Sequence, residues 1–252
     1  MKILNRHLIT SIIILICSIL LFEVTNIDLW IQDYFFNSDL QKWILDRDDP
    51  VSRLIFYDGI KKVYYLMFIL FLIGLFLSRK IKWLRNYKYG LLIVCFSAVL
   101  VPSTIAGLKA ITNVPCPKDI QHFGGKYPHV TFLEKYPASF HQTGKIKCYP
   151  AGHASGGFSL LSLIFLFKKR KNRKIAFYTA MFLGWSTGVY KMLIGDHFLS
   201  HTLTTMLLSW VIILMIAKYI YHYYRINDHN EYNVLPEFPV SYEYFRLLFK
   251  NS

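Results

Sequence analysis

The chain has 252 residues, of which 54% are hydrophobic and 17% are charged, and its formal net charge is +14. Soluble domains carry about 25% charged and 45–50% apolar residues. The apolar residues here gather into runs that approach the roughly 20 residues needed to cross a bilayer. This pattern excludes an ordinary soluble domain and predicts an all-α integral membrane protein. Because the basic residues concentrate in short loops, their charge indicates membrane orientation and no binding of nucleic acid.

Six apolar segments are predicted to span the membrane as helices. Their ranges are 7–24, 62–78, 88–107, 153–167, 174–194 and 202–221. The fourth is short, and its apolar run begins in earnest only at Phe158. No small-x-small cleavage site follows the first segment, so we expect it to remain as an anchor.

The basic loops predict the orientation of the bundle. They lie at 79–88 and 168–174, after the second and fourth segments. By the positive-inside rule these loops and both chain termini face the cytoplasm. We therefore expect a single membrane domain over residues 1–225, followed by a polar cytoplasmic tail at 226–252.

Three connections are predicted on the opposite, outer side. Residues 25–61 alternate aromatic and acidic side chains, which favours short amphipathic helices at the membrane interface. Residues 108–152 form a long polar loop rich in Pro and Gly. The third connection, 195–201, is very short. Most residues that could carry chemistry lie in these connections or at the ends of the segments beside them.

Three histidines lie beside the apolar segments on this side. His153 follows a Pro-Ala-Gly turn and opens a helix, whose free N–H groups attract anions. His197 and His201 are four residues apart and share one face of a helix. The pair could hold a metal with His153 as third ligand, or contain a nucleophilic imidazole held by a second group. Polar residues at a membrane interface are the simplest alternative.

Two lysines stand at the outer ends of otherwise apolar segments: Lys109 directly follows the third segment, and Lys191 lies near the end of the fifth. A lysine at such a depth can extend its ammonium group to the interface without further function. It can also serve as the charge partner of an anion. Together with the histidines, the two lysines predict a phosphate site at the outer end of a helix bundle.

The order and spacing of these residues resemble the type 2 phosphatidic acid phosphatase (PAP2) family, whose fold is shared with vanadium haloperoxidases. The family motifs read Lys-x6-Arg-Pro, Pro-Ser-Gly-His and Ser-Arg-x5-His-x3-Asp. In this chain they correspond to Lys109 with Cys116-Pro117, to Pro150-Ala151-Gly152-His153, and to Tyr190-Lys191 with His197 and His201. The resemblance covers about residues 60–220. Four phosphate-handling positions depart from the family pattern: Cys116, Ala151, Lys191 and His201.

The resemblance implies a six-helix bundle of the PAP2 type with extra interfacial helices, and it assigns roles to the histidines. His197 would attack phosphorus and form a phosphohistidine, while His153 would protonate the leaving group. His201 stands where the family has an aspartate that orients the nucleophile, and a neutral imidazole there could accept the His197 N–H. Either Asp119 or Asp196 would supply the missing negative charge.

Substrate binding follows from the same resemblance. It would rest on Lys109, Lys191 and Gly152, with no metal and no cofactor. Since Lys is a point charge and lacks the planar fork of Arg, Lys191 is not an equivalent replacement. The positive charge lost with the two family arginines is expected to come from lysines of the long loop, namely Lys118, Lys145 or Lys147.

Two of the four cysteines, Cys116 and Cys148, lie on the predicted outer side, beside the first and second motifs. An oxidising compartment favours disulfides. We therefore predict that Cys116 and Cys148 are bonded and hold Lys109 and His153 in one site. Free or merely buried thiols are the alternative.

These observations predict a phosphatase that acts on a lipid phosphate monoester or pyrophosphate at the outer face of the bacterial cytoplasmic (inner) membrane. Lipid A, undecaprenyl pyrophosphate and glycerophospholipid phosphates are the substrates that the resemblance implies. Its partners would be this lipid and the membrane, with no obligate protein partner. The alternatives are transfer of phosphate between lipids, a non-catalytic lipid-binding or transport module, and a metal site made of the three histidines.

Overall fold

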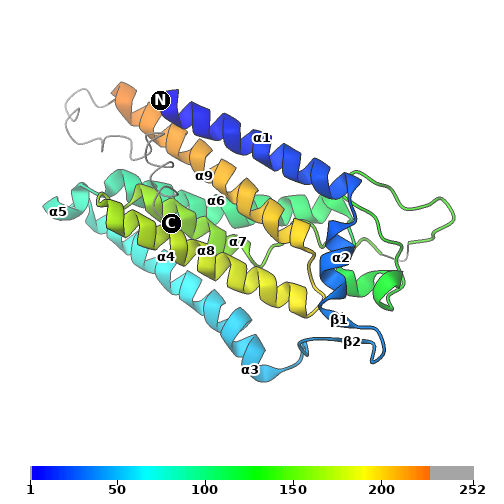
Figure 1. Cartoon of the computed structure of the whole chain (residues 1–252). Coiled ribbons are helices and arrows are strands. Elements are labelled where there is room, and N and C mark those ends of the chain that lie inside the picture. The colour runs from blue at the N-terminus through cyan, green and yellow to red at the C-terminus, as the bar shows by residue number, and fades with distance from the viewer. Residues whose placement is uncertain (1, 143, 228–252) are drawn as a thin grey trace.

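The computed structural model describes residues 2–142 and 144–227, which form a bundle of roughly parallel and antiparallel helices (Figure 1). The long helices are α1 (Lys2–Val24), α4 (Ile60–Leu77), α6 (Lys88–Thr112), α8 (Arg170–Leu193) and α9 (Leu199–Asn227). A shorter helix, α7 (Ser155–Ser159), continues into the 3-10 helix η4 (Leu160–Phe165). The predicted all-α fold is confirmed.

A helix occupies each of the six ranges in which a span was predicted, although the bounds differ. Four helical stretches are long and apolar enough to cross a membrane: Lys2–Val24, Pro50–Leu77, Lys88–Asp119 and Leu199–Tyr224. The stretch Ser155–Phe165 is apolar but shorter. Helix α8 is 24 residues long, and its basic first turns make it less apolar than the other long helices. The predicted tail begins inside α9, and residues 228–252 lie outside the described part.

The remaining elements lie in the connections. Between α1 and α4 are α2 (Ile27–Asp33), a two-stranded antiparallel sheet of β1 (Phe36–Asn37) and β2 (Lys42–Trp43), α3 (Pro50–Arg53) and the π-helical turn η1 (Leu54–Gly59). Helix α5 (Lys82–Arg85) joins α4 to α6. The long loop after α6 contains the 3-10 helices η2 (Pro117–Asp119) and η3 (Gln121–Phe123).

The main core lies between the helices and depends on one very close contact. Phe158 and Ile213 are fully buried there. A Cβ atom added to Gly157 would lie 2.5 Å from the backbone nitrogen of Gly184, closer than real Cβ atoms approach. The backbones of α7 and α8 can therefore touch only because glycine stands at this position. Helix α7 begins at Ser155, two residues after His153.

A second, smaller core holds the connections against the bundle. Phe36, Ile120, Phe123 and Phe198 are buried together, with Trp43 packed on them. These side chains come from the small sheet, the long loop and the turn between α8 and α9. Apolar burial of this kind contributes about 1.5–3 kcal/mol for each large side chain. The cluster therefore positions the α8–α9 turn, which carries His197.

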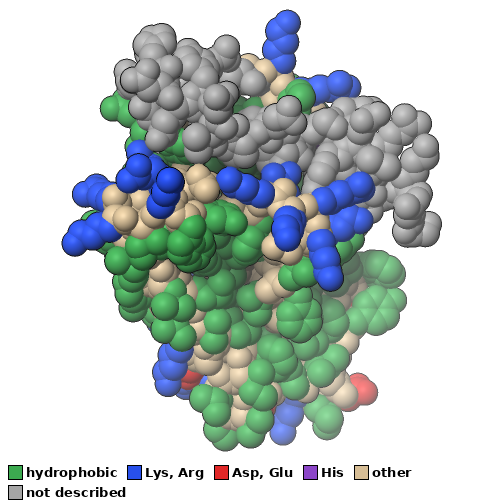
Figure 2. All heavy atoms as spheres, turned by 90° about the vertical axis from the view of Figure 1, so that its left-hand side faces the viewer, with side chains coloured by type: hydrophobic (Ala, Val, Ile, Leu, Met, Phe, Trp, Pro, Cys, Tyr) green, Lys and Arg blue, Asp and Glu red, His purple; other side chains and the backbone are tan. Residues whose placement is uncertain are grey.

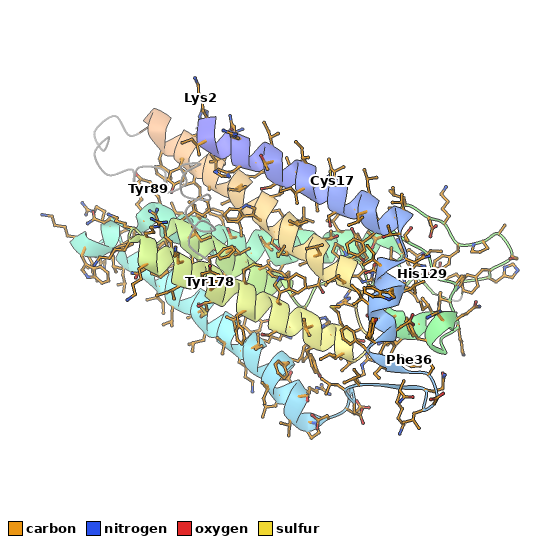
Figure 3. All side chains as sticks on the ribbon, in the orientation of Figure 1. Lys2, Cys17, Phe36, Tyr89, His129 and Tyr178 are labelled. Atoms are coloured by element: carbon orange, nitrogen blue, oxygen red, sulfur yellow. A yellow bond between two sulfur atoms is a disulfide. The ribbon has the colours of Figure 1, made fainter. Side chains whose placement is uncertain are left out.

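The two ends of the bundle differ in charge. Lys2 lies at one end, whereas Phe36 and His129 lie at the other (Figure 3). Helix α5 and the start of α8, which are rich in Lys and Arg, lie at the first end as well (Figure 1), and we call it the basic end. Figure 2, which views the molecule from this end, shows Lys and Arg side chains gathered on the surface. Between the ends, Ile13, Leu66 and Phe182 are more than half exposed. Exposed apolar sides flanked by a basic end are expected of a bundle that lies in a bilayer.

Candidate active site

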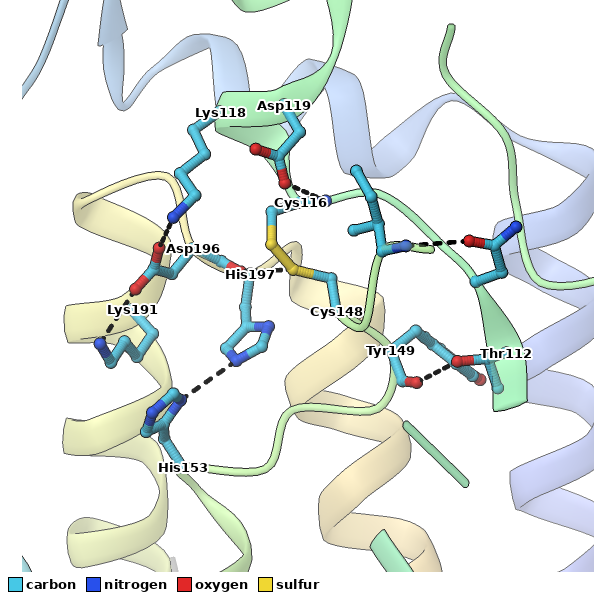
Figure 4. Close-up of a disulfide and its surroundings, with 12 residues drawn as sticks. Thr112, Cys116, Lys118, Asp119, Cys148, Tyr149, His153, Lys191, Asp196 and His197 are labelled. Atoms are coloured by element: carbon cyan, nitrogen blue, oxygen red, sulfur yellow. Dashed lines mark hydrogen bonds and ion pairs between the residues drawn. A yellow bond between two sulfur atoms is a disulfide. The ribbon is translucent and has the colours of Figure 1, made fainter. Parts of the chain in front are cut away.

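The three histidines lie together at the end opposite the basic end. The Nδ1 atom of His153 is 3.5 Å from Nε2 of His197, so the two rings share a hydrogen bond (Figure 4). The ring of His201 meets that of His197 edge to face, with centroids 5.7 Å apart. His197 and His201 are 1% and 2% exposed, whereas His153 is only partly buried. A substrate can therefore reach the pair from the side of His153.

A tight turn between α8 and α9 positions His197. Gly195 adopts a φ of +71°, a left-handed conformation that favours glycine. The backbone N–H groups of Asp196 and His197 then both donate to the carbonyl of Lys191, at 2.8 and 3.2 Å. At the start of α9, the N–H of Ser200 donates to a carboxylate oxygen of Asp28 at 2.9 Å, which caps the helix from α2. The segment that carries His197 is thus held on both sides by hydrogen bonds that backbone N–H groups donate.

The turn before His153 is attached to α9 and faces a lysine of α6. The N–H of Ala151 donates to the carbonyl of His201 at 3.1 Å, and the hydroxyl of Thr205 donates to the carbonyl of Ala151 at 3.1 Å. A Cβ atom on Gly152 would lie 3.9 Å from Nζ of Lys109, so this ammonium group lies against the turn. Three segments that are far apart in sequence thereby meet at one point.

Asp196 collects cations beside His197. One of its carboxylate oxygens accepts from Nζ of Lys118 at 2.8 Å, and the other accepts from Nζ of Lys191 at 2.9 Å (Figure 4). Arg47, in the loop between β2 and α3, bonds the same oxygen as Lys118. Burial opposes ionisation of this carboxyl, but the hydrogen bond from Lys118 and the charge of Lys191 outweigh it and lower the pKa of Asp196. The carboxylate therefore stays ionised and keeps the cations in place.

The electrostatic surroundings of His197 keep its ring neutral. Burial comes first, and the charges of neighbouring histidines and lysines add to it, so that the pKa of His197 lies well below its usual value. A neutral imidazole has a free lone pair on one nitrogen, which a nucleophile needs. The Nε2 atom of His197 faces His153.

A cavity of about 550 Å³ opens beside His153 and runs between α4, α6 and α7. His153 and Gly152 line one part of it, and the rest is mainly apolar, with Phe68, Val94 and Leu160 among its walls. Binding sites for small molecules are commonly apolar cavities of this size with a few polar groups. The cavity connects His153 with the apolar interior of the bundle.

Comparison with known proteins now adds to this geometry. The sequence pattern of the PAP2 superfamily matches residues 90–225, more than half of the chain. This chain belongs to the PAP2 superfamily. It is also 24% identical over 198 residues to a lipid A 4'-phosphatase of Francisella tularensis subsp. novicida (strain U112), an alignment that covers 77% of this chain and 86% of that protein. No solved structure matches the chain.

In this PAP2 protein, the contact of His201 with His197 differs from the hydrogen bond that the family resemblance suggested. No hydrogen bond joins the two rings. The Nδ1 atoms of both are buried without a hydrogen-bond partner among the residues that the structure describes. Neither Asp196 nor Asp119 bonds the His197 ring, since Asp196 binds cations and Asp119 accepts from the N–H of Cys116. That His201 orients His197 stays a prediction, and the contact between the two rings is the observation that supports it.

The lysines expected to replace the family arginines behave differently from one another. Lys118 reaches Asp196, whereas Lys145 and Lys147 are exposed on the long loop of this PAP2 protein.

Arg47 is a residue that sequence reasoning missed. It lies 149 positions before Asp196, in the connection 25–61, where the sequence drew attention only to acidic and aromatic residues. It belongs to no motif.

A disulfide joins Cys116 to Cys148, with Cα atoms 5.3 Å apart, and Cys148 Sγ lies 3.4 Å from the carbonyl of Asp196 (Figure 4). The bond connects the loop after α6 to the turn that precedes His153. It also lies directly against the α8–α9 turn. The disulfide therefore lies in contact with the segments that carry the histidine pair.

Replacing Cys116 and Cys148 together with serine is expected to lower the stability of the folded protein by about 3–4 kcal/mol, because the bond closes a loop of 32 residues. Thermal unfolding in detergent, followed by tryptophan fluorescence, measures the change. Cys17→Ser, which removes an exposed cysteine of α1, is the matched control. An unfolding temperature equal to that of the wild type in the double variant would contradict the prediction.

The metal alternative receives no support from the three histidines. In the described part of this PAP2 protein, the group with potential ligand atoms within 4.8 Å of one another is Cys116, Asp119 and Cys148. Two of these three residues form the disulfide, and a bonded sulfur offers no thiolate to a metal ion.

Proposed function

We propose that this protein hydrolyses a lipid phosphate monoester or pyrophosphate through a phosphohistidine intermediate at the outer face of the bacterial cytoplasmic membrane, with both termini in the cytoplasm. The observation that carries the proposal is the His153–His197 pair, 3.5 Å apart, where an apolar cavity meets a cluster of cations. A lipid phosphate combines an apolar tail with an anionic head. The cavity suits the first, and the cations suit the second.

The proposed reaction has two steps. Nε2 of His197 attacks phosphorus, the bond from phosphorus to the leaving oxygen breaks, and His153 gives that oxygen a proton. Water then attacks the phosphohistidine, the phosphorus–nitrogen bond breaks, and His153 takes the proton of the water. Lys109, Lys191 and the Gly152 backbone bind the phosphate oxygens. The chemistry requires no metal ion.

Lipid A is the first substrate to test, since the similar Francisella protein is a lipid A 4'-phosphatase. Undecaprenyl pyrophosphate and glycerophospholipid phosphates present the same combination of phosphate and long apolar chain. Transfer of the phosphate to a second lipid would use the same nucleophile, and only the acceptor in the second step would differ. The products therefore decide between hydrolysis and transfer.

The test is phosphate release by purified protein in detergent across a panel of lipid A, undecaprenyl pyrophosphate, phosphatidic acid and phosphatidylglycerol phosphate. We expect release from at least one of these lipids, in the presence of a chelator as well as without it. A radiolabelled donor phosphate incubated with an excess of an unlabelled lipid acceptor separates free phosphate from a phosphorylated product. Failure to release or transfer phosphate from all four lipids would contradict the proposed function.

A further inference from the structure

The cation cluster around Asp196 carries more positive charge than the carboxylate balances. Arg47, Lys118 and Lys191 all bond its two oxygens, and Lys109 lies against the neighbouring turn. The side chains of Asp196 and Lys191 are only 9% and 10% exposed. Like charges held close together at a poorly hydrated place repel one another, which a further anion relieves. The cluster therefore favours binding of a multiply charged anion.

Arg47 differs from the other three cations in chemistry and in access. Its guanidinium group is planar and offers parallel N–H donors that match two oxygens of a phosphate, whereas each lysine offers a point charge. Its side chain is 49% exposed, while that of Lys118 is 29% exposed. An anion that arrives from outside the bundle therefore meets the Arg47 side chain where it is still accessible.

The fold holds the backbone near Arg47 against the turn that carries His197. The N–H of Leu45 donates to the carbonyl of Leu193 at 3.3 Å, two residues before Arg47. A Cβ atom on Gly195 would lie 2.3 Å from the Trp43 ring, so this ring packs directly on the turn. Arg47 thus approaches Asp196 from a segment that is attached to the turn at two points, and its position does not depend on the ion pair alone.

We propose that Arg47 is a phosphate-binding residue of this site, which bonds Asp196 in the free protein and the substrate phosphate when a substrate is bound. The assignment rests on the proposed function for its substrate, but the binding of phosphate itself does not require turnover. Asp196 is then a positioning residue that holds Arg47, Lys118 and Lys191 together before the phosphate arrives. When substrate binds, the hydrogen bond that Arg47 donates to Asp196 is replaced by one to a phosphate oxygen.

The experiment compares Arg47→Gln and Arg47→Lys with the wild type. Arg53→Gln is the matched control, because it removes an arginine of α3 that pairs with Asp58, at 3.5 Å, outside the cluster. Inorganic phosphate is the probe in calorimetric titrations of the purified protein, and KM and kcat are measured with the best lipid of the panel. Loss of a hydrogen bond to a charged group corresponds to about a 10–100-fold change.

We expect Arg47→Gln to weaken phosphate binding and raise KM by that factor, with a smaller change in kcat, and Arg47→Lys to lie between it and the wild type. Arg53→Gln should change each value less than about twofold. Unchanged phosphate affinity in Arg47→Gln, or a loss confined to kcat, overturns the proposal. If Arg47→Gln does not fold, Arg47→Lys decides, since it keeps the charge opposite Asp196. If the wild-type protein binds inorganic phosphate but releases none from the lipids, the proposed function is contradicted. The phosphate titrations of the Arg47 variants then test the role of Arg47 on their own.

Discussion

Replacing His197 with alanine is expected to reduce phosphate release from the lipid substrate by on the order of 10⁴-fold or more, the scale on which loss of a nucleophile acts. The ring is fully buried, and its Nε2 atom faces His153 at 3.5 Å. In the proposed mechanism, the first bond to phosphorus cannot form without this ring. Initial rates with the best lipid of the panel measure the effect. Trapping of a phosphorylated protein whose label is stable in alkali and lost in acid, as expected of phosphohistidine, gives a second measurement.

Two controls keep this prediction sharp. His197→Gln fills more of the buried space than alanine and cannot form a phosphohistidine, so it should be as inactive while unfolding at nearly the wild-type temperature. His122→Ala removes an imidazole of η3 that pairs with Asp33 outside the site, and should retain activity. A His197→Gln protein that folds and keeps more than about a tenth of the activity would rule out His197 as the nucleophile.

The protonation of His197 adds a consequence for pH. Because burial holds the pKa of His197 well below its usual value of about 6.5, the ring should stay neutral as the pH falls through the range in which an ordinary histidine gains its proton. The neutral, nucleophilic form is lost only below the lowered pKa, not near 6.5. Histidine-selective NMR of the free protein, assigned with His197→Gln, reads the titration directly. A midpoint near 6.5 for this ring would show that it is hydrated and would weaken its assignment.

The helices could largely be predicted from the sequence, because apolar runs of membrane length leave few alternatives for the backbone. Their ends could not. Helix α6 continues to Thr112, beyond the predicted end at 107, and so carries Lys109 on a helix. The short α7 and its 3-10 continuation depend on the contact of Gly157 with Gly184, and a contact between distant glycines leaves no periodic signal in the chain.

The candidate site divides in a similar way. Residues that belong to spaced motifs, such as His153 and His197, could be found because their spacing places them on particular helix ends. The partners of Asp196 could not, since Arg47 comes from a segment whose approach is set by packing of Trp43 on Gly195. The family resemblance suggested a hydrogen bond from His197 to His201, whereas the two rings meet edge to face. Spacing predicts which residues share a face, and packing decides which atoms meet.

Replacing His153 with alanine is expected to slow hydrolysis of the lipid substrate by about 10²–10⁴-fold, the usual contribution of a general acid. The ring is only partly buried beside the cavity and Tyr57, so its removal should disturb the fold little. A lipid alkoxide is a poor leaving group and needs a proton, which His153 gives in the proposed mechanism. A nitrophenyl phosphate leaves without one, so the first step with this ester should be nearly as fast in His153→Ala as in the wild type.

The comparison of two leaving groups separates proton transfer from a structural role. With the nitrophenyl ester, His153→Ala should show a rapid burst of nitrophenol followed by slow turnover, because water then attacks the phosphohistidine without a base. Phosphorylated His197 should accumulate during the slow phase, and the additional substitution His197→Gln should abolish the burst. Equal losses with the lipid and the aryl ester, and no burst, would mean that His153 positions the site and does not transfer the proton.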